Sequence, residues 1–564
     1  MISVRRFATE TQKNIVNLKN GIKSQINIIH SLNGTNNENN SVGKLKSNDN
    51  IEASKADNNV ANLKFKKSKK KFEKKSTINY KDSLTPLLET WRAIKPMKYT
   101  LKSINDDAHE KVPKLAHGLD KILINPGYHF LKNPKNGTYN YPPFLKSITQ
   151  PEDFDYSKLT PFIKPSEDLT LQKHAENLKK KYVGSTSSMT GAMSQLYFLI
   201  SNFKNADTLK FSSAFAGEGK SMEKMLVSEQ NDYEKFIKAS LVEPNDNLEE
   251  SYIYSTFKDF LVRSQLDCKD QRLKKITFDL KTRAVVAVRM DVENYKETRG
   301  YQITKGAGLL QSFEREYYDL VRSAFLKYNF QTRIGHMDGV FVAYHNTASI
   351  CGFQYISTKE MDRRLYGNSI TGNYSFNSTL TLLNEILNTI TAEIPDKNLI
   401  LSFSANEPSQ SLTLWVEGLS STQNEILSAN DSITTPENTE TKKSKLTYPE
   451  NPDLSENSDK VSLQDIEIEI DPNSDIRKYN IKVRTFINDE LVNGEYMLNS
   501  NRDKAEYDWS ITQELVREPH QDYKIFRNKQ RTYFTRGRFK DKVPSFIKTL
   551  REISKRCQQN TNEN

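Results

Sequence analysis

The chain has 564 residues, a formal net charge of +11 and only three cysteines. This length allows two or three domains with proper cores, and no run approaches the roughly 18 apolar residues that a membrane-spanning helix needs. Cys268, Cys351 and Cys557 lie far apart without a CxxC pair, which argues against a disulfide framework and against a zinc site. The moderate basic excess suits a nucleic acid or an anionic membrane surface, although many ordinary proteins are equally basic.

Residues 1–30 have the pattern of a mitochondrial targeting segment. Arg5 and Arg6 precede the first acid, Glu10, and isoleucines and leucines then recur every three or four positions among lysines. A basic amphipathic helix that lacks early acids is typical of an import signal. The alternative is a disordered basic tail.

Residues 31–83 are rich in Asn, Lys and Ser and contain few aliphatic side chains, so we expect them to be disordered. Within them, the run from Lys64 to Lys75 holds eight lysines and one acid. Such a run is either a solvated tail or an electrostatic contact to RNA or to anionic lipid headgroups.

Residues 84–210 are expected to be an ordered N-terminal extension of the main domain. Their middle part, residues 120–170, is rich in Pro, Tyr and Phe and predicts extended structure punctuated by turns. The stretch from Tyr182 to Phe203 begins in a Gly/Ser/Thr loop and continues as an apolar helix. The start of this helix offers backbone amides and hydroxyls to a phosphate, and a plain capped helix is the alternative.

Residues 211–420 alternate between helical and strand patterns, which predicts a mixed sheet flanked by helices. One helix is expected from Ser312 to about Gln331, because its apolar residues recur at helical spacing as a core stripe. The other expected elements are a short helix at 219–226 and strands at 260–267, 276–290 (one or two strands), 339–345, 350–356, 399–405 and 411–418.

The C-terminal part is expected to be β-rich. Residues 421–462 are polar and predict a disordered insertion. Residues 463–564 predict a β-hairpin and a basic C-terminal region, with the hairpin turning at Asn493-Gly494 between residues 481–489 and 493–500.

Arginines and lysines are interleaved with Tyr and Phe from Tyr523 to Lys542. This mixture gives bases a stacking platform and phosphates a positive groove, whereas the alternative is a basic face whose stems pack on the domain. The residues that we assign to RNA binding are Arg283, Arg527, Arg531, Tyr533, Phe534, Arg536 and Arg538.

Two charges interrupt the apolar stretch "ITFDLKTRAVVAVRM" at residues 276–290. Asp279 and Lys281 are two residues apart, so in a strand they point to the same face. Burying an unpaired charge is costly, but carboxylates can hold Mg²⁺, and a nearby ammonium can orient the water that attacks a phosphodiester. Asp267 is the candidate for the second acid, because an antiparallel hairpin would return it to the same edge of the sheet, and Glu223 is the candidate for a third.

Other interpretations of these residues stay open. The pair of charges is also explained as a structural one that Arg283 or another partner neutralises. His336 and His345 flank a strand near the predicted site, where they are either metal ligands or ordinary satisfied histidines.

Several long strings give the sequence a family resemblance, among them "YVGSTSSMTGA", "GKSMEK", "FLVRSQLD", "FDLKTRAVVAVRMD" and "SFEREYYDLVRSAFLKYNFQTRIGHMDGVFVAYHNT". Over roughly residues 90–360 the chain resembles a fungal family of mitochondrial RNA 5′-end-processing and RNA-stability factors. That family is similar to a divergent branch of the PD-(D/E)xK superfamily, whose fold is a restriction-endonuclease-like mixed sheet of αβββαβ topology. The resemblance implies an α/β (α+β) fold, metal ligation by Asp267, Asp279 and Glu223, and assistance of the nucleophilic water by Lys281. The chain departs from the superfamily pattern at Leu266, where a proline usually precedes the first acid.

The resemblance also implies partners and a location. The expected protein acts on mitochondrial RNA in 5′-end processing and RNA stability, as an Mg²⁺-dependent nuclease or as a catalytically silent RNA-binding scaffold. A scaffold would recruit an RNA-degrading exonuclease or the mitochondrial RNA polymerase. Its expected location is the matrix side of the inner membrane, through peripheral contacts only, and a third hypothesis makes it a peripheral membrane organiser of gene expression.

Overall fold

The computed structural model describes residues 90–148, 163–165, 167–208, 210–216, 238, 241–243, 251–395, 397–420, 470–534 and 543–562. Contacts divide the chain into a unit of residues 7–88 and a unit of the remainder, and every described residue belongs to the second unit. The expected targeting segment, the Lys/Asn-rich region, the helix at 219–226 and the insertion at 421–462 lie outside the described residues.

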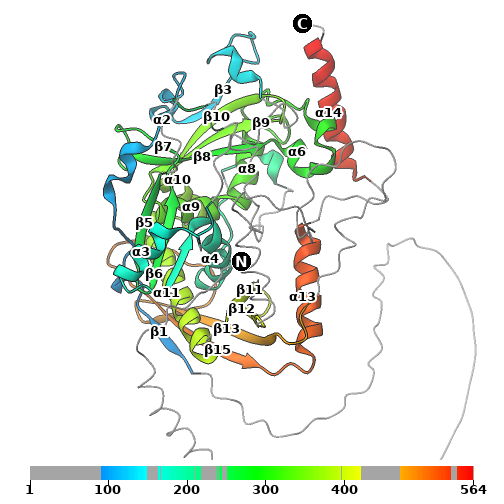
Figure 1. Cartoon of the computed structure of the whole chain (residues 1–564). Helices are drawn as coiled ribbons and strands as arrows, with labels where there is room; N and C mark the ends of the chain where they lie inside the picture. The colour runs from blue at the N-terminus through cyan, green and yellow to red at the C-terminus, as the bar shows by residue number, and fades with distance from the viewer. Residues whose placement is uncertain are drawn as a thin grey trace, which may run out of the picture. The chain divides into compact units, whose positions relative to one another are not determined.

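A five-stranded mixed sheet forms the upper part of the described unit in Figure 1. β8 and β9 are parallel, because a long helical crossover connects them, whereas the other neighbours are antiparallel. This confirms the mixed sheet flanked by helices that the sequence predicts. In spatial order the strands are β3 (Gly127–Phe130), β10 (Ile350–Ser357), β9 (Gly339–His345), β8 (Thr277–Ala284) and β7 (Cys268–Lys269).

Both faces of this sheet are covered. On one face, Val340 and Val342 pack in the main core with α8 (Phe313–Ser323) and α9 (Phe325–Ile334). The opposite face belongs to a second cluster, in which Phe341 packs with residues from 115–148.

The single helix that the sequence predicts at 312–331 is wrong in detail, because the structure has two helices, α8 and α9. The chain breaks between them at Ala324, whose φ of −116° lies outside ideal helix geometry. The predicted core stripe is largely confirmed, since Phe313, Leu320, Val321, Ala324 and Phe325 are buried.

A four-stranded sheet adjoins the first, and α3 (Leu169–Asn177) covers one of its faces. We expected the strand ending near Asp267 and the strand carrying Asp279 in a single sheet. They belong to two sheets, because the chain leaves the four-stranded sheet after Gln265 and enters the five-stranded sheet at Cys268. In spatial order the strands are β2 (Lys102–Ser103), β5 (Tyr252–Phe257), β6 (Phe260–Gln265) and β4 (Tyr182–Ser185).

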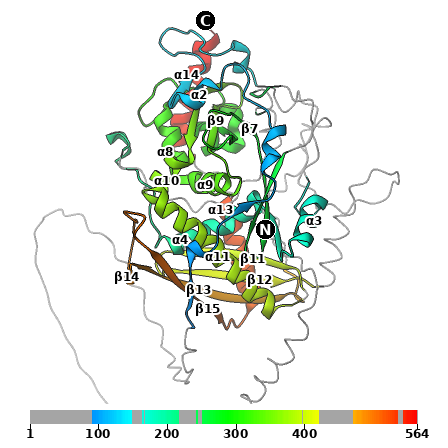
Figure 2. The same cartoon turned by 90° about the vertical axis from the view of Figure 1, so that its left-hand side faces the viewer.

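The third sheet holds the β-rich C-terminal part that the sequence predicts. α4 (Thr186–Ile200) and α11 (Ser369–Glu393) lie over it (Figure 2), while α13 (Pro519–Phe534) packs against β13. In spatial order its strands are β1 (Arg92–Ile94), β15 (Ala505–Glu514), β13 (Asp475–Ile487), β12 (Ser411–Gly418) and β11 (Leu399–Asn406), with β14 (Glu490–Val492) on β13.

Two local predictions in the second half of the chain are wrong. The hairpin turns at Asn488 and Asp489, not at Asn493-Gly494, and residues 493–500 form no strand. Both turn residues have positive φ, 51° and 69°, as a two-residue hairpin turn requires. The apolar run after β8 is a helix, α6 (Val286–Met290), because a short apolar run has no period that separates helix from strand.

The remaining helices are short or peripheral. No helix in the described ranges combines the length and the apolar character that crossing a bilayer requires. The predicted peripheral membrane contact stays a prediction. The remaining elements are α2 (Lys121–Ile124), α7 (Tyr295–Thr298), α10 (Thr358–Tyr366), α14 (Ser545–Asn562) and the 3-10 helices η1 (Pro96–Lys98), η2 (Asp106–Lys111), η3 (Pro143–Lys146), η6 (Ser213–Phe215) and η7 (Val292–Asn294).

The close pairing of β3 with β10 depends on Gly352. A Cβ at this position would meet the carbonyl oxygen of His129 and the ring of Phe313. We expect Gly352→Ala to lower the free energy of unfolding by about 1–3 kcal/mol, because this packed pair leaves no room for a methyl group. Urea denaturation measures the change. Gly184→Ala is the control, because its Cβ would meet the flexible side chain of Met189, and an equal loss in both variants would contradict the explanation.

Candidate active site

The hairpin between β7 and β8 brings the two predicted acids together. Cys268 pairs with Phe278 and Lys269 with Thr277, so extending the register by one residue places Asp267 opposite Asp279. Side chains directly opposite each other in an antiparallel pair have Cβ atoms about 4.5–5.5 Å apart. Both carboxylates are withdrawn from solvent, with side-chain exposures of 10% for Asp267 and 8% for Asp279.

Each acid has a lysine partner. Lys281 Nζ lies 2.7 Å from Asp279 Oδ2, and Lys238 Nζ lies 2.8 Å from Asp267 Oδ2. The backbone N–H of Leu280 also donates to Asp267 Oδ2 at 3.0 Å. The predicted same-face arrangement of Asp279 and Lys281 is thus present. Two carboxylates and two ammonium groups form one compact cluster, which makes the burial of these charges tolerable.

The surroundings separate the pKa values of the two acids. Burial raises the pKa of Asp267, but Lys238, a hydrogen bond with Asp279 and Lys281 outweigh it and lower the pKa to about 2. Burial raises the pKa of Asp279 to about 6, and the charge of Asp267 adds to this effect while Lys281 opposes it. Asp267 therefore stays ionised as the pH falls, whereas Asp279 takes up a proton already at weakly acidic pH.

Asp267 and Asp279 open onto a small polar cleft with a volume of about 60 Å³, which we call the acid cleft. The buried guanidinium of Arg263 forms one wall, and its ion pair with Asp168 fixes it there. Asp168 also caps α3 by accepting from the N–H of Leu171. Further polar groups in the cleft wall are Ser185, Thr186, Ser187, Tyr252, Ser264, Gln265 and Gln331.

The start of α4 reaches this cleft. Ser185 accepts from the N–H of Ser188, and the Ser188 hydroxyl accepts from the N–H of Ser185, which completes a capping box. The plain capped helix that we weighed at this position is therefore present. Because the same residues line the cleft, the helix start also faces the acids with its polar end.

The donor set of the acid pair suits a hard divalent cation. Asp267 and Asp279 are close enough to share a hydrogen bond, so a cation can take the place of the proton between them. Mg²⁺ prefers oxygen ligands and is commonly held by one or two carboxylates together with water and phosphate. Within the described ranges no cluster of three or more His, Cys, Asp or Glu side chains could hold a metal ion, so the described part supplies these two carboxylates only.

The outcome for the predicted site residues is mixed. Asp267, Asp279 and Lys281 lie together, whereas Glu223 lies outside the described residues. Arg283 does not neutralise the acids, because its guanidinium donates to Ser323 Oγ at 3.2 Å. Sequence reasoning missed Lys238, Arg263, Gln265 and Gln331. Of these, Arg263 and Gln265 carry a usable signal, because they share one face with Asp267 in the predicted strand at 260–267.

The two histidines are satisfied by local partners. His336 Nε2 lies 3.1 Å from the Ser255 hydroxyl, and His345 Nδ1 accepts from the N–H of Thr347 at 3.1 Å. Neither lines the acid cleft. The ordinary structural interpretation of both residues therefore holds.

The predicted RNA-binding face near the C-terminus is only partly described. Arg527 donates to the hydroxyl of Tyr523 at 2.9 Å, and Tyr523 is fully buried against Trp415. These two residues fit the alternative of a basic face packed on the domain. The side chains of Arg531, Tyr533, Phe534, Arg536 and Arg538 lie outside the described residues, so their assignment stays a prediction, as does that of Arg283.

Comparisons with known proteins agree with the sequence resemblance. The family model described as "Mitochondrial protein Pet127" matches residues 162–218 and 217–388. The "mRNA degradation protein pet127, mitochondrial" of Schizosaccharomyces pombe is 35% identical over 370 residues, which cover 56% of this chain and 70% of that protein. The "Putative mitochondrial translation system component PET127" of Saccharomyces cerevisiae is 34% identical over 355 residues. This match covers 53% of the chain but only 44% of the Saccharomyces protein.

Among solved structures, the chain is similar to Rai1 of Scheffersomyces stipitis. The crystal structure in complex with (3′-NADP)+ and calcium ion overlaps with a TM-score of 0.28 at 12% identity, covering 60% of this chain and 93% of that chain. The structure of Rai1 alone gives a TM-score of 0.24 at 12% identity, covering 54% and 93%. Overlaps this slight do not establish a shared fold.

A double-mutant cycle tests the coupling of Lys238 to Asp267. We expect Lys238→Met and Asp267→Asn each to lower the free energy of unfolding by about 2–4 kcal/mol, since each leaves one buried charge with fewer partners. The double variant should lose less than the sum, which chemical denaturation measures. The control is Lys204→Met, whose pair with the 46% exposed Glu495 should contribute under about 1 kcal/mol. Additive losses at Lys238 and Asp267 would contradict the pairing.

The buried imidazole of His345 predicts a pH dependence. Burial, with a contribution from Arg289, lowers the pKa of His345 to about 4. Between pH 6.5 and 4 the unfolded state therefore binds a proton that the folded state does not. Stability is full above pH 6.5 and falls by up to about 3 kcal/mol as the pH drops toward 4. Urea unfolding at pH 7 and pH 4.5 should show a smaller difference in His345→Asn, whereas the partly exposed control His109→Asn should keep the wild-type difference.

Proposed function

Because this chain belongs to the Pet127 family, we propose that it is a mitochondrial factor in RNA 5′-end processing and RNA degradation. We propose that Asp267, Asp279 and Lys281 form a PD-(D/E)xK-like site that hydrolyses phosphodiesters. The observation that carries this proposal is the register of the β7–β8 hairpin, which puts two buried carboxylates opposite each other with a lysine two residues along the strand. Acids and an ammonium group in this arrangement are what metal-assisted hydrolysis of a phosphodiester requires.

The names of the relatives support the choice of substrate. The Schizosaccharomyces relative is named for mRNA degradation and the Saccharomyces relative for the mitochondrial translation system. Both names contain the word mitochondrial. We propose the same mitochondrial location for this chain, with mitochondrial RNA as its partner. The described acid-cleft residues all fall within the stretches that the family model matches.

The residues divide the chemistry among them. Asp267 and Asp279 would hold Mg²⁺, which supplies Lewis-acid stabilisation of charge at the phosphate and a more acidic water. Lys281 would orient this water against phosphorus. In the hydrolysis, the water oxygen bonds to phosphorus and the bond to the leaving sugar oxygen breaks. One proton leaves the water, and the leaving oxygen takes up a proton. The start of α4 supplies polar groups that would steady the phosphate oxygens.

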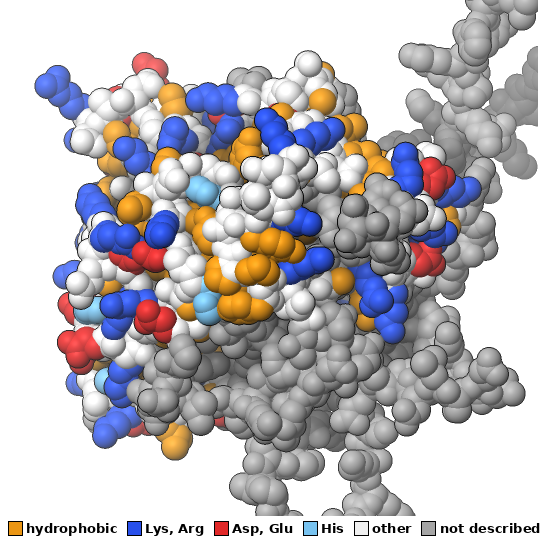
Figure 3. All heavy atoms as spheres, turned by 90° about the horizontal axis from the view of Figure 1, so that it is seen from above, with side chains coloured by type: hydrophobic (Ala, Val, Ile, Leu, Met, Phe, Trp, Pro, Cys, Tyr) orange, Lys and Arg blue, Asp and Glu red, His pale blue; other side chains and the backbone are white. Residues whose placement is uncertain are grey.

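The surface charge favours a polyanionic substrate. On the face shown in Figure 3, Lys and Arg side chains are more frequent than Asp and Glu, in line with the net charge of +11. Phosphate contacts by such residues provide the sequence-independent part of RNA binding.

A second candidate is a catalytically silent scaffold that binds RNA and recruits an exonuclease or the mitochondrial RNA polymerase. The observation that favours it is the pairing of both carboxylates with lysines at 2.7 and 2.8 Å. Ion pairs of this kind can maintain the fold without any metal, so the site would be structural.

Two variants separate catalysis from metal binding. We expect Asp279→Asn to reduce Mg²⁺-dependent cleavage of a 5′-extended RNA by about a hundredfold or more and to abolish the rise in melting temperature that Mg²⁺ produces. Lys281→Met should lose cleavage to a similar degree but keep the Mg²⁺-dependent rise. Gel-resolved cleavage and thermal unfolding measure the two effects.

The control for these variants is Asp270→Asn, which removes a carboxylate that pairs with Arg272 instead of lining the cleft. It should keep both cleavage and the Mg²⁺ response. If the wild-type protein binds RNA but neither cleaves it nor responds to Mg²⁺, the scaffold replaces the nuclease as the function.

A further inference from the structure

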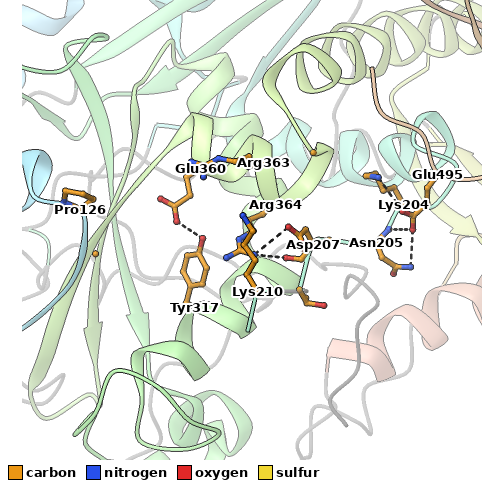
Figure 4. A pocket seen from close by; sticks show the side chains of 14 residues that line it. Pro126, Lys204, Asn205, Asp207, Lys210, Tyr317, Glu360, Arg363, Arg364 and Glu495 are labelled. Carbon is orange, nitrogen blue, oxygen red and sulfur yellow. Dashed lines mark hydrogen bonds and ion pairs between the residues drawn. The ribbon is translucent and has the colours of Figure 1, made fainter. Parts of the chain in front are cut away.

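A second, larger cleft shares no lining residue with the cleft at the acid pair (Figure 4). Its volume is about 770 Å³, and residues 204–208 together with Lys210, which follow α4, form one wall while α8 and α10 form another. The acid cleft is at the opposite end of α4, at Ser185–Ser187. The chain runs from one cleft to the other along α4, whose 15 residues span about 22 Å at a rise of 1.5 Å per residue. We call the larger one the distal cleft.

The walls of the distal cleft are held in place by their own contacts. Arg364 lies 3.7 Å from the carboxylate of Asp207, and the backbone N–H of Asp207 donates to the Arg364 carbonyl at 2.7 Å. Lys204 pairs with Glu495 at 3.3 Å. These contacts tie the segment after α4 to α10 and to the C-terminal part of the chain, so the cleft exists without a ligand.

Two cations of the distal cleft have no acidic partner among the residues that the structure describes. Lys210 and Arg363 are both exposed, and neither makes an ion pair with any residue that the structure describes. The nearby carboxylate of Glu360 instead accepts a hydrogen bond from the Tyr317 hydroxyl at 2.5 Å. An ammonium and a guanidinium at the mouth of a preformed cleft are suited to phosphate, because Arg binds phosphate oxygens with two parallel donors and Lys acts as a point charge.

We propose that the distal cleft binds the phosphates of the same RNA strand whose scissile bond lies at the acid pair. This inference rests on the proposed function. A stacked strand advances about 3.4 Å per nucleotide, so the length of α4, about 22 Å, corresponds to roughly six or seven nucleotides. RNA long enough to reach from one cleft to the other gains the contacts of Lys210 and Arg363, whereas very short RNA does not. The distal cleft thus selects long substrates and holds them in register.

The test compares two RNA lengths with two charge-matched double variants. Lys210→Ala/Arg363→Ala removes one lysine and one arginine from the distal cleft, and Lys548→Ala/Arg556→Ala removes the same charges from the exposed face of α14. Both are made on an Asp279→Asn background, so that the RNA stays intact. Fluorescence anisotropy then measures the affinity for a dodecanucleotide and for a trinucleotide, with AMP as a third ligand in equilibrium dialysis.

We expect the distal-cleft variant to bind the dodecanucleotide about tenfold more weakly. The slope of log affinity against log salt should become less steep by about 1.4, because two phosphate contacts on a single strand are lost. Its affinity for the trinucleotide should not change, and the α14 variant should bind both RNAs like the background. Equal losses in the two double variants would overturn the proposal, because they would reflect overall charge. A loss of AMP binding without a loss for the dodecanucleotide would overturn it in favour of a free nucleotide.

The result also separates this inference from the proposed function. If wild-type protein cleaves RNA through Asp279 but the distal-cleft variant binds the dodecanucleotide normally, only the distal cleft is wrong. If the background protein binds neither RNA, the proposed function fails together with it.

Discussion

The pairing of Asp267 with Asp279 across the β7–β8 hairpin is the constraint on which the rest of the site depends. Two carboxylates buried side by side repel each other, and neither would stay ionised without compensation. Lys238 and Lys281 supply it, one to each acid. The hairpin also joins two sheets, because the chain passes from β6 to β7 at Asp267. The charged cluster therefore lies at the seam between the sheets, where backbone from both sides can position it.

The alternation of β8 explains how one strand carries both a core and a site. Phe278 and Leu280 point into the apolar cluster that covers one face of the five-stranded sheet. Asp279 and Lys281 point to the other face, toward the polar cleft. A slip of one residue in the register would expose the apolar pair and bury the charges among apolar side chains. Core packing thus enforces the placement of Asp279 and Lys281, which need no special loop to hold them.

The sequence was informative where a local pattern decides the outcome and silent where distant segments meet. The same-face relation of Asp279 and Lys281, the strands of the mixed sheet and the core stripe through Phe313 follow from periodicity alone. Lys238 does not, because nothing near it in the chain marks it as a partner for an acid 29 positions later. The helix at Val286–Met290 and the turn at Asn488-Asp489 were missed for a different reason. Short apolar runs and competing turn signals are ambiguous until tertiary packing selects one.

The charge balance of the cluster also determines how a cation can enter it. Two aspartates and two lysines cancel, so a divalent ion placed between the carboxylates would leave an uncompensated double positive charge in a poorly solvated cleft. A phosphodiester brings negative charge to the same place. In the proposed nuclease, metal and RNA therefore bind together, each making the other's entry more favourable, which is the reciprocal coupling that linkage requires. The lysines that stabilise the free protein would then weaken metal binding until a substrate phosphate arrives.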